Sequence, residues 1–332
     1  MRANYPPSEP GPAARDILTV VGESLVDIIT DLHRPAATRA HAGGSPLNVA
    51  VGAARLGLPT NLVTHYAADP YGVMIEEHLV SNGVHVINGG ATPTSTALAT
   101  LGPDGAADYT FSITWDINGA SLPALAAVDV STHVHTGSVA TVLPPGNLAT
   151  LALVEAAREH ATISYDPNCR PAISPDVAAA RQQAEVFVAA SDIVKARDED
   201  LSWLYPHRTA EETLQAWLDL GPAIVVMTRG SSGPVILSDK GRVEMAAEPI
   251  IVADTVGAGD SFMAGLISGL AQLEALGADC SHRLQTLTLD QLHALAEYAN
   301  RAAAITCSRP GANPPRSAEL GPLPALSPAQ EH

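Results

Sequence analysis

The chain of 332 residues is 46% hydrophobic and 16% charged, which provides enough apolar material for a large folded core and excludes an intrinsically disordered chain. Its formal net charge of −17 opposes binding to nucleic acids and to anionic membrane surfaces. No apolar stretch reaches the length of a membrane span, and the three cysteines are scattered without a C-x-x-C pair, so we expect a reducing, cytoplasmic location with no zinc site or disulfide framework.

Strand and helix patterns alternate along most of the chain. In chain order, the expected strands cover residues 17–22, 61–64, 84–87, 132–135, 162–165, 193–195 and 224–227. The clearest helical patterns cover residues 71–81, 147–159, 175–190, 261–273 and 291–306. This alternation predicts an α/β fold with a doubly wound, mostly parallel sheet and helices on both faces.

Two stretches, residues 25–42 and 94–118, break the alternation because they lack a helical period. In the second stretch, large apolar side chains alternate strictly from Tyr109 to Trp115, which is typical of a strand with one covered face. We interpret both stretches as a small β-sheet lid; the alternative is an edge hairpin of the main sheet.

The expected domain organisation is one large domain over residues 16–315, including the lid. Residues 1–15 are rich in proline and are predicted to form a flexible N-terminal tail, and residues 316–332 a C-terminal tail.

A glycine pair, Gly43 and Gly44, directly precedes a small-residue helical segment that has Pro46 near its first turn. Asn48 lies one turn inside this helix, where its amide offers both donors and acceptors to a polyol. Upstream, the segment Val20-Val21-Gly22-Glu23-Ser24-Leu25-Val26-Asp27 indicates a strand that ends in the carboxylate of Asp27. Each feature alone is also compatible with an ordinary packed helix and a solvated turn residue.

A second glycine-rich turn, Gly257-Ala258-Gly259-Asp260, opens the helical pattern at 261–273. Glycines let the backbone approach a ligand closely, and the N–H groups of a first helical turn attract anions such as phosphate. The carboxylate of Asp260 would repel a phosphate, but it is suited to accept a proton from a hydroxyl that attacks phosphorus. The alternative is a turn in which Asp260 only caps the helix.

Together, the two motifs make the chain similar to the PfkB or ribokinase family of carbohydrate kinases, from about residue 16 to 315. The segment Asp166-Pro167-Asn168-Cys169-Arg170-Pro171 and the sequence around Asn48 resemble fructokinases most. The resemblance implies a ribokinase-like fold and an ATP-dependent sugar kinase with a β lid over the sugar.

The resemblance also implies roles for the residues of the two motifs. Asp260 would be the catalytic base, beside an anion hole formed by the backbone N–H groups of Gly257, Ala258 and Gly259. The residues that would hold sugar hydroxyls are Asp27, Gly43, Gly44 and Asn48.

The roles of Asp166, Asn168 and Arg170 stay open. In fructokinase-like relatives this segment lines the site, which makes Asn168 and Arg170 candidates for substrate binding. In the related 2-keto-3-deoxygluconate kinases, an arginine at this place helps to hold the substrate carboxylate, which suits a guanidinium fork. The alternative is a rigid loop with Arg170 in a structural ion pair.

The resemblance also implies a nucleotide-binding part of the site. It is matched by the strand that ends at Thr228 and by the glycine turn from Gly230 to Gly233 that follows. Candidate nucleotide-binding residues are Lys195, Arg197, Thr228, Gly230, Gly233 and Asn300. The family commonly carries Asn-x-x-Glu where this chain has Arg197-Asp198-Glu199-Asp200. Asp200 would then support the magnesium shell indirectly, and Arg197 is a candidate for a direct phosphate contact. The glycine turn is also compatible with a plain hairpin.

The resemblance also implies a monovalent cation beside the anion hole, K⁺ in ribokinase-like relatives. The matching positions are Asp254, Val256, Thr306 and Gly311.

The expected reaction is phosphorylation of a sugar's primary hydroxyl by ATP with Mg²⁺, most simply fructose to fructose 6-phosphate. Open alternatives are a 2-keto-3-deoxygluconate kinase, a ribokinase, a nucleoside kinase with an aromatic wall for the base, and a non-catalytic sugar-binding regulator. No nucleic-acid or membrane partner is expected. Lids of this family often pair, so a homodimer through the lid is possible.

Overall fold

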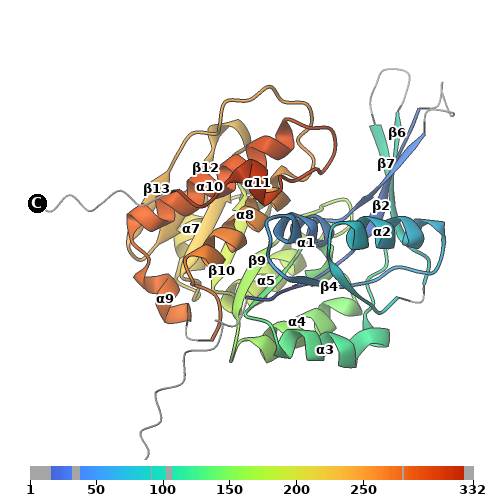
Figure 1. The fold of residues 1–332 in the computed structure, drawn as a ribbon, viewed down its shortest axis with the longest axis horizontal. Coiled ribbons are helices and arrows are strands. Elements are labelled where there is room, and N and C mark those ends of the chain that lie inside the picture. The colour runs from blue at the N-terminus through green and yellow to red at the C-terminus, as the bar shows by residue number, and fades with distance from the viewer. Residues whose placement is uncertain (1–15, 32–37, 91, 102–106, 279, 325–332) are drawn as a thin grey trace, which may run out of the picture.

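The computed structural model describes residues 16–31, 38–90, 92–101, 107–278 and 280–324. Its large sheet has the strand order β13-β12-β11-β10-β9-β8-β1-β4-β5 (Figure 1). Its neighbouring strands pair parallel except at β11–β12 and β12–β13, which pair antiparallel. The strands are β1 (Leu18–Val21), β4 (Thr60–Thr64), β5 (His85–Asn88), β8 (His133–Gly137), β9 (Thr162–Asp166), β10 (Ile193–Arg197), β11 (Ile224–Thr228), β12 (Pro234–Ser238) and β13 (Gly241–Glu244). The predicted doubly wound, mostly parallel α/β fold is confirmed.

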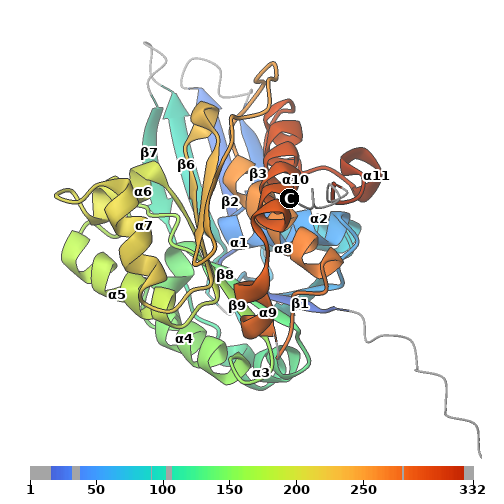
Figure 2. The ribbon, with the colours of Figure 1, turned by 90° about the vertical axis from the view of Figure 1, so that its left-hand side faces the viewer.

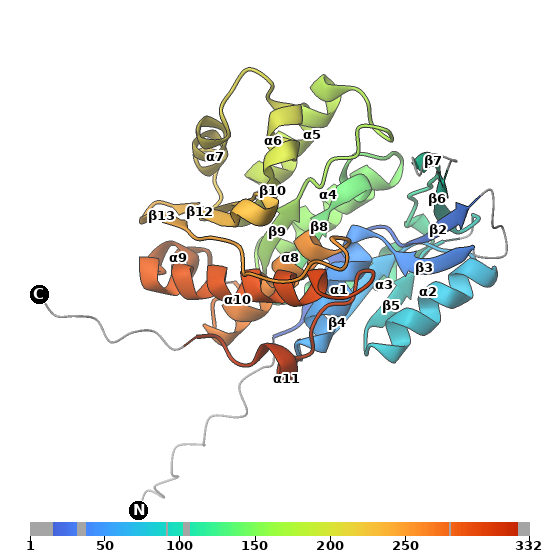
Figure 3. The ribbon, with the colours of Figure 1, turned by 90° about the horizontal axis from the view of Figure 1, so that it is seen from above.

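Helices cover both faces of this sheet, as the view from above shows (Figure 3). One layer consists of α1 (Ser45–Arg55), α2 (Pro70–Ser81), α8 (Ala258–Gln272), α9 (Cys280–Thr286) and α10 (Leu289–Cys307). The other consists of α3 (Ser121–Asp129), α4 (Gly146–Ala157), α5 (Val177–Ala189), α6 (Asp198–Leu204) and α7 (Ala210–Leu218). Short 3-10 turns lie at η2 (Asn118–Ala120), η3 (Ser138–Thr141) and η4 (Gly230–Ser232).

The two helical layers enclose two hydrophobic clusters, one on each face of the sheet. Successive residues of a strand contribute to opposite clusters; in β10, Ile193 joins one cluster and Val194 the other. Because both faces are buried, the central strands are nearly continuous apolar runs, and this is why the sequence pattern locates them well. Within the part of the chain that the structure describes, no helix is long and apolar enough to cross a bilayer.

A second, four-stranded sheet stands at one end of the molecule (Figures 1 and 2). Its order is β3-β2-β6-β7, and its strands are β2 (Leu25–Asp31), β3 (Arg39–Gly43), β6 (Ser95–Leu101) and β7 (Ala107–Ser112). The predicted small sheet is therefore present, and it is separate from the main sheet rather than an edge hairpin of it.

The boundaries of this small sheet differ from the prediction in two places. Strand β7 ends at Ser112, so the alternation that we followed to Trp115 continues beyond the strand. Trp115 is fully buried in the large domain, where its indole N–H donates to Thr150 of α4 at 3.0 Å. In addition, Asp27 does not end a strand of the main sheet but lies inside β2.

The predicted C-terminal tail is wrong for its first residues. Helix α11 (Ser317–Leu320) packs on α10, and Leu320 is fully buried against Tyr298. The remaining tail predictions, residues 1–15 and 325–332, lie outside the described residues.

Candidate active site

A cleft of about 310 Å³ opens between the small sheet and the carboxyl ends of the central strands. The N-termini of α1 and α8 both reach it, so the two glycine-rich motifs, far apart in the sequence, meet at one place. The predicted site residues that line the cleft are Asp27, Gly44, Asn48, Asn168, Arg170, Lys195, Arg197, Val256, Gly257, Ala258, Gly259 and Asp260.

The anion-binding turn at the start of α8 has the expected backbone. Gly257 has a φ of 75°, the left-handed conformation that glycine adopts without strain. A β-carbon at Gly257 would also lie 2.6 Å from the side chain of Ala312. The helix then begins at Ala258, so the N–H groups of its first turn point toward the cleft and carry partial positive charge.

Asp260 lies in the first turn of α8 and is only 8% exposed. Its two carboxylate oxygens accept hydrogen bonds from α1: Ser45 Oγ donates to Oδ1 at 2.6 Å, and Asn48 Nδ2 donates to Oδ2 at 2.8 Å. Burial raises the pKa of Asp260, while the bonds from Ser45 and Asn48 and the charge of Lys195 act in the opposite direction. A buried carboxylate with a raised pKa beside an anion-binding turn is suited to act as a general base.

Asn48 therefore contacts the carboxylate rather than only facing the cleft as a sugar ligand, which the sequence did not predict. Ser45 was not selected from the sequence at all. The signal that would have found both residues is their i, i+3 spacing on the first turn of α1, which puts them on one face of that helix.

Replacing Ser45 with alanine is expected to impair the enzyme most at acidic pH. The Ser45 hydrogen bond favours the charged carboxylate, so its loss raises the pKa of Asp260 further, and the acid limb of kcat/KM moves to higher pH. Because a hydrogen bond to a charged group contributes about 1.5–3 kcal/mol, we expect a loss of roughly tenfold below the acid limb.

The matched control for this pH profile is Ser268→Ala in α8, the helix that carries Asp260. Ser268 Oγ is buried and has no hydrogen-bond partner among the residues that the structure describes. The Ser268 variant should keep the wild-type profile. An unmoved acid limb in Ser45→Ala would show that Ser45 does not tune the base.

Lys195 and Asp166 form a buried ion pair beneath the anion-binding turn. Lys195 Nζ lies 2.7 Å from Asp166 Oδ2, and both side chains are only 2% exposed. A β-carbon at Gly259 would lie 3.1 Å from the same Nζ, so the ammonium approaches the backbone of the turn closely. The predicted nucleotide residue Lys195 thus places a positive charge where a transferred phosphoryl group would lie.

A neutral polar layer extends from this pair into the sheet. His135 Nδ1 hydrogen-bonds Ser164 Oγ at 2.8 Å, and Ser164 also contacts His133 Nε2 at 2.8 Å. Burial and the charge of Lys195 lower the pKa of His135 to about 3. The imidazole therefore stays neutral at physiological pH, and Lys195 has Asp166 as its charged partner here.

Carboxyl groups also lie at the small-sheet end of the cleft. Asp27 projects from β2 beside Gly43, where a β-carbon would lie 2.3 Å from Asp27 Oδ2; only glycine leaves room for the carboxylate. Glu23, which sequence reasoning missed, is buried at the cleft wall and accepts a hydrogen bond from Ala140 N at 3.3 Å. Burial raises the pKa of Asp27 and raises that of Glu23 to about 7, and Arg170 opposes both shifts.

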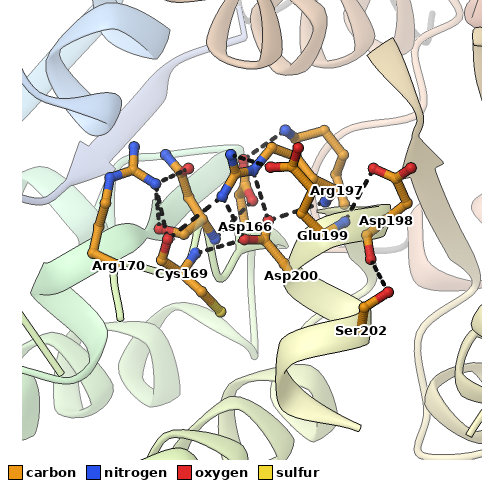
Figure 4. A network of polar contacts seen from close by, with 10 residues as sticks. Asp166, Cys169, Arg170, Arg197, Asp198, Glu199, Asp200 and Ser202 are labelled. Atoms are coloured by element: carbon orange, nitrogen blue, oxygen red, sulfur yellow. Dashed lines mark hydrogen bonds and ion pairs between the residues drawn. The ribbon is translucent and has the colours of Figure 1, made fainter. Parts of the chain in front are cut away.

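The loop that follows β9 is held together by Arg170 (Figure 4). Arg170 Nη1 donates to the carbonyl oxygens of Asn168 and Cys169 at 2.9 and 3.0 Å and to Asn168 Oδ1 at 2.6 Å. Asn168 itself has a φ of 38°, and its N–H bonds Asp166 Oδ1. These hydrogen bonds connect the residues of the loop to one another, and both Asn168 and Arg170 also line the cleft. Burial raises the pKa of the neighbouring Cys169 thiol, as expected for an inert cysteine.

Asp200 does not fit its predicted role in a magnesium shell. Its side chain is 1% exposed, and each oxygen already accepts two hydrogen bonds (Figure 4). Oδ1 accepts from Arg197 Nη2 at 2.6 Å and from Cys169 N at 3.0 Å, and Oδ2 from Arg197 N and Nε at 3.1 and 3.0 Å. Arg197, which replaces the asparagine of the family pattern, takes up this carboxylate.

The other predicted nucleotide residues lie away from this cleft's lining. Thr228 ends β11, and Gly230 opens the η4 turn that follows. Gly233 has a structural reason to be glycine, because a β-carbon there would lie 2.2 Å from Met245 O. Asn300 Nδ2 donates to Ala246 O at 2.9 Å, so its amide holds the loop after β13. Their contact with a nucleotide stays a prediction.

Three of the four residues predicted to hold a monovalent cation come together. Asp254 accepts hydrogen bonds from Val256 N at 3.1 Å and Gly311 N at 2.9 Å. Thr306 differs, because its hydroxyl is buried and donates to Ser261 Oγ at 2.7 Å. Its carbonyl also accepts from Arg309 N at 3.1 Å, so Thr306 has other partners.

A doubly wound sheet with a small second sheet and a buried carboxylate in an anion-binding turn defines a phosphoryl-transfer enzyme that acts on a small hydroxyl substrate. The chain matches the pfkB family carbohydrate kinases over residues 16–319, and it belongs to that family.

Individual relatives agree with this assignment. The chain is 32% identical over 260 residues to a fructokinase of Rhizobium leguminosarum bv. trifolii, covering 75% of this chain and 78% of the relative. An uncharacterized sugar kinase from Pyrococcus horikoshii has a TM-score of 0.75 at 25% identity, over 92% of this chain and 96% of that one. A fructokinase double mutant from Vibrio cholerae O395, bound to fructose, ADP and a potassium ion, has a TM-score of 0.74 at 24% identity, over 92% and 97%.

Proposed function

We propose that this carbohydrate kinase transfers the γ-phosphoryl group of ATP to the primary hydroxyl of fructose and forms fructose 6-phosphate. The observation that supports the proposal most is the position of Asp260: a buried carboxylate, held by two donors from α1, inside the anion-binding turn of α8. The fructokinase relatives support the choice of sugar.

In the proposed reaction, Asp260 accepts the proton of the sugar hydroxyl while the hydroxyl oxygen forms its bond to the γ-phosphorus. The bond from that phosphorus to the bridging oxygen of ADP breaks, and ADP leaves with the electron pair. Negative charge on the transferring group faces the N–H groups of the first turn of α8 and the ammonium of Lys195. Asp260 then returns its proton to solvent.

The charges at the small-sheet end favour a neutral polyol over a sugar acid. Asp27 and Glu23 line this end, and the guanidinium of Arg170 already donates through Nη1 to three acceptors of its own loop. A substrate carboxylate would meet two acidic side chains here, whereas a carboxylate and a protonated carboxyl can each bind sugar hydroxyls. This arrangement argues against 2-keto-3-deoxygluconate as the substrate.

The aromatic side chains do not favour a nucleoside substrate. Trp115, which was a candidate wall for a purine, is buried in the core beside Thr150. Phe111 lines the cleft, and the side chain of Tyr109 lies outside the described residues. Phe111 is thus a single, partly buried ring among polar groups, and it offers a poor stacking surface for a nucleoside base.

ATP is the proposed phosphoryl donor, and Mg²⁺ would neutralise its phosphates. We do not place Asp200 in the magnesium shell, because Arg197 already binds its carboxylate. A potassium ion beside the anion-binding turn is also proposed, at Asp254, Val256 and Gly311, in line with the ion bound to the Vibrio fructokinase. Such an ion would orient the turn from Asp254 to Gly257 before the sugar binds.

We expect activity to be several-fold higher in KCl than in NaCl at equal ionic strength. Both salts screen surface charge equally, so a difference reports a site that discriminates between the two cations. The measurement is the initial rate at saturating fructose and ATP in each salt. Equal rates would remove the cation from the proposal and leave the reaction itself untouched.

The substrate proposal is tested by coupled ADP-release assays with fructose, ribose, 2-keto-3-deoxygluconate and adenosine. Fructose should give the highest kcat/KM, and the product should carry its phosphate at C6. A higher kcat/KM with any of the other three acceptors would contradict the choice of fructose. Turnover of none of them would contradict sugar phosphorylation by this site.

A further inference from the structure

The guanidinium of Arg197 has two edges with very different partners (Figure 4). Its Nε and Nη2 atoms donate to the buried carboxylate of Asp200 at 3.0 and 2.6 Å. Its Nη1 atom donates to Glu199 Oε2 at 3.1 Å. The Asp200 side chain is 1% exposed, whereas the Glu199 side chain is 77% exposed. One edge of the guanidinium therefore has a buried partner and the other edge an exposed one.

The Asp200 edge fixes the orientation of the guanidinium. Two parallel hydrogen bonds to one carboxylate hold its plane, and Asp200 is itself tied to the loop after β9 through Cys169 N at 3.0 Å. Because Asp200 already holds the guanidinium of Arg197 in place, this group loses little rotational freedom when a second anion binds its other edge.

The Glu199 edge is weakly held. Ion pairs between exposed side chains contribute little, because water screens the charges and both side chains lose freedom. An anion bound nearby in the cleft would compete effectively with Glu199 for Nη1.

The position of Arg197 identifies that anion. Arg197 lines the same cleft as Lys195 and the turn from Gly257 to Gly259. It is the last residue of β10 and the N-cap of α6, beside the place where the proposed reaction puts the nucleotide phosphates. A planar guanidinium is well matched to phosphate oxygens.

We propose that Arg197 binds a phosphate of the nucleotide through its Nη1 edge, and that Glu199 occupies this edge until the nucleotide displaces it. Glu199 is thus an internal competitor that weakens nucleotide binding, and Asp200 orients the guanidinium instead of serving a metal. This inference rests on the proposed use of ATP and names how the chain regulates that part of the site.

The test is calorimetric titration of ADP in EDTA, and again with Mg²⁺, on the full chain. Glu199→Gln should bind ADP about two- to fivefold more tightly, the gain expected when a weak exposed pair no longer competes. Arg197→Gln should bind ADP about tenfold more weakly, as for the loss of one charged contact. In the double variant, Glu199→Gln should bring no gain, because the guanidinium for which it competes is absent.

The matched control is Asp198→Asn, which removes the same charge one residue away. Asp198 Oδ1 bonds the backbone N–H of Glu199 and not Arg197. An equal gain in Glu199→Gln and Asp198→Asn would overturn the inference, since general electrostatics would then explain both. A gain that persists without Arg197 would overturn it as well. Absence of ADP and ATP binding by the wild-type chain would instead overturn the proposed function on which the inference rests.

Discussion

Asp260→Asn is expected to lower kcat by about 10²–10⁴-fold while the KM for the sugar and for ATP changes little. Asparagine keeps the shape of the side chain and can still accept a hydrogen bond from Ser45, but it cannot take the proton of the sugar hydroxyl. The expected loss is therefore confined to the chemical step. Steady-state kinetics of the variant measure kcat and both KM values, and calorimetric titration with ADP measures nucleotide binding.

A kcat within about threefold of the wild type would show that Asp260 is not the base. A large rise in KM at unchanged kcat would assign Asp260 to substrate binding instead. The Ser268→Ala variant, in the same helix, serves as the folding control because the Ser268 hydroxyl makes no hydrogen bond among the described residues.

Lys195→Met is expected to destabilise the fold by about 3–5 kcal/mol in the free energy of unfolding, because it leaves the buried charge of Asp166 without its partner. Activity should fall as well, since the ammonium beneath the anion-binding turn is lost. Urea denaturation followed by circular dichroism, and kinetics on the folded fraction, measure the two effects.

The double variant Lys195→Met with Asp166→Leu separates stability from catalysis. Replacing both charges with apolar side chains removes the unpaired charge, so most of the lost stability should return. Activity should stay low, because the positive charge at the turn is still absent. Restored activity in the double variant would mean that Lys195 supports only the fold.

The sequence predicted the main sheet and the glycine-rich turn that precedes α8 well for one physical reason. Strands buried on both faces are continuous apolar runs, and a helix N-terminus that binds an anion needs small residues such as Gly257 and Gly259 at fixed places. Both requirements concern neighbouring residues, so they can be recognised in the sequence. Asp27 was predicted as a sugar-binding residue for a different reason, namely the resemblance to a family. Its stretch was assigned to the small sheet, but its position inside β2 instead of at a strand end was not foreseen.

The parts that failed depend on the direction of a side chain in the folded molecule. Trp115 continues the alternation of β7, yet it turns into the core after the strand has ended. Asp200 was expected to support the magnesium shell indirectly, because it matches the glutamate of the family pattern, but the neighbouring Arg197 takes up its carboxylate. Asn48 binds Asp260, more than two hundred positions away. The spacing of Ser45 and Asn48 indicates a shared face of α1, but no local pattern identifies Asp260 as their partner. The buried Leu320 was likewise hidden in a proline-rich stretch.

The most direct test of the account is the distance between Asp260 and the acceptor hydroxyl in a crystal structure of the ternary complex with fructose and a non-hydrolysable ATP analogue. The account predicts a carboxylate oxygen of Asp260 at about 2.6–3.2 Å from the C6 hydroxyl oxygen, with the γ-phosphate on the first turn of α8. Fructose bound with its C6 hydroxyl turned away from Asp260, or the γ-phosphate placed elsewhere, would contradict it.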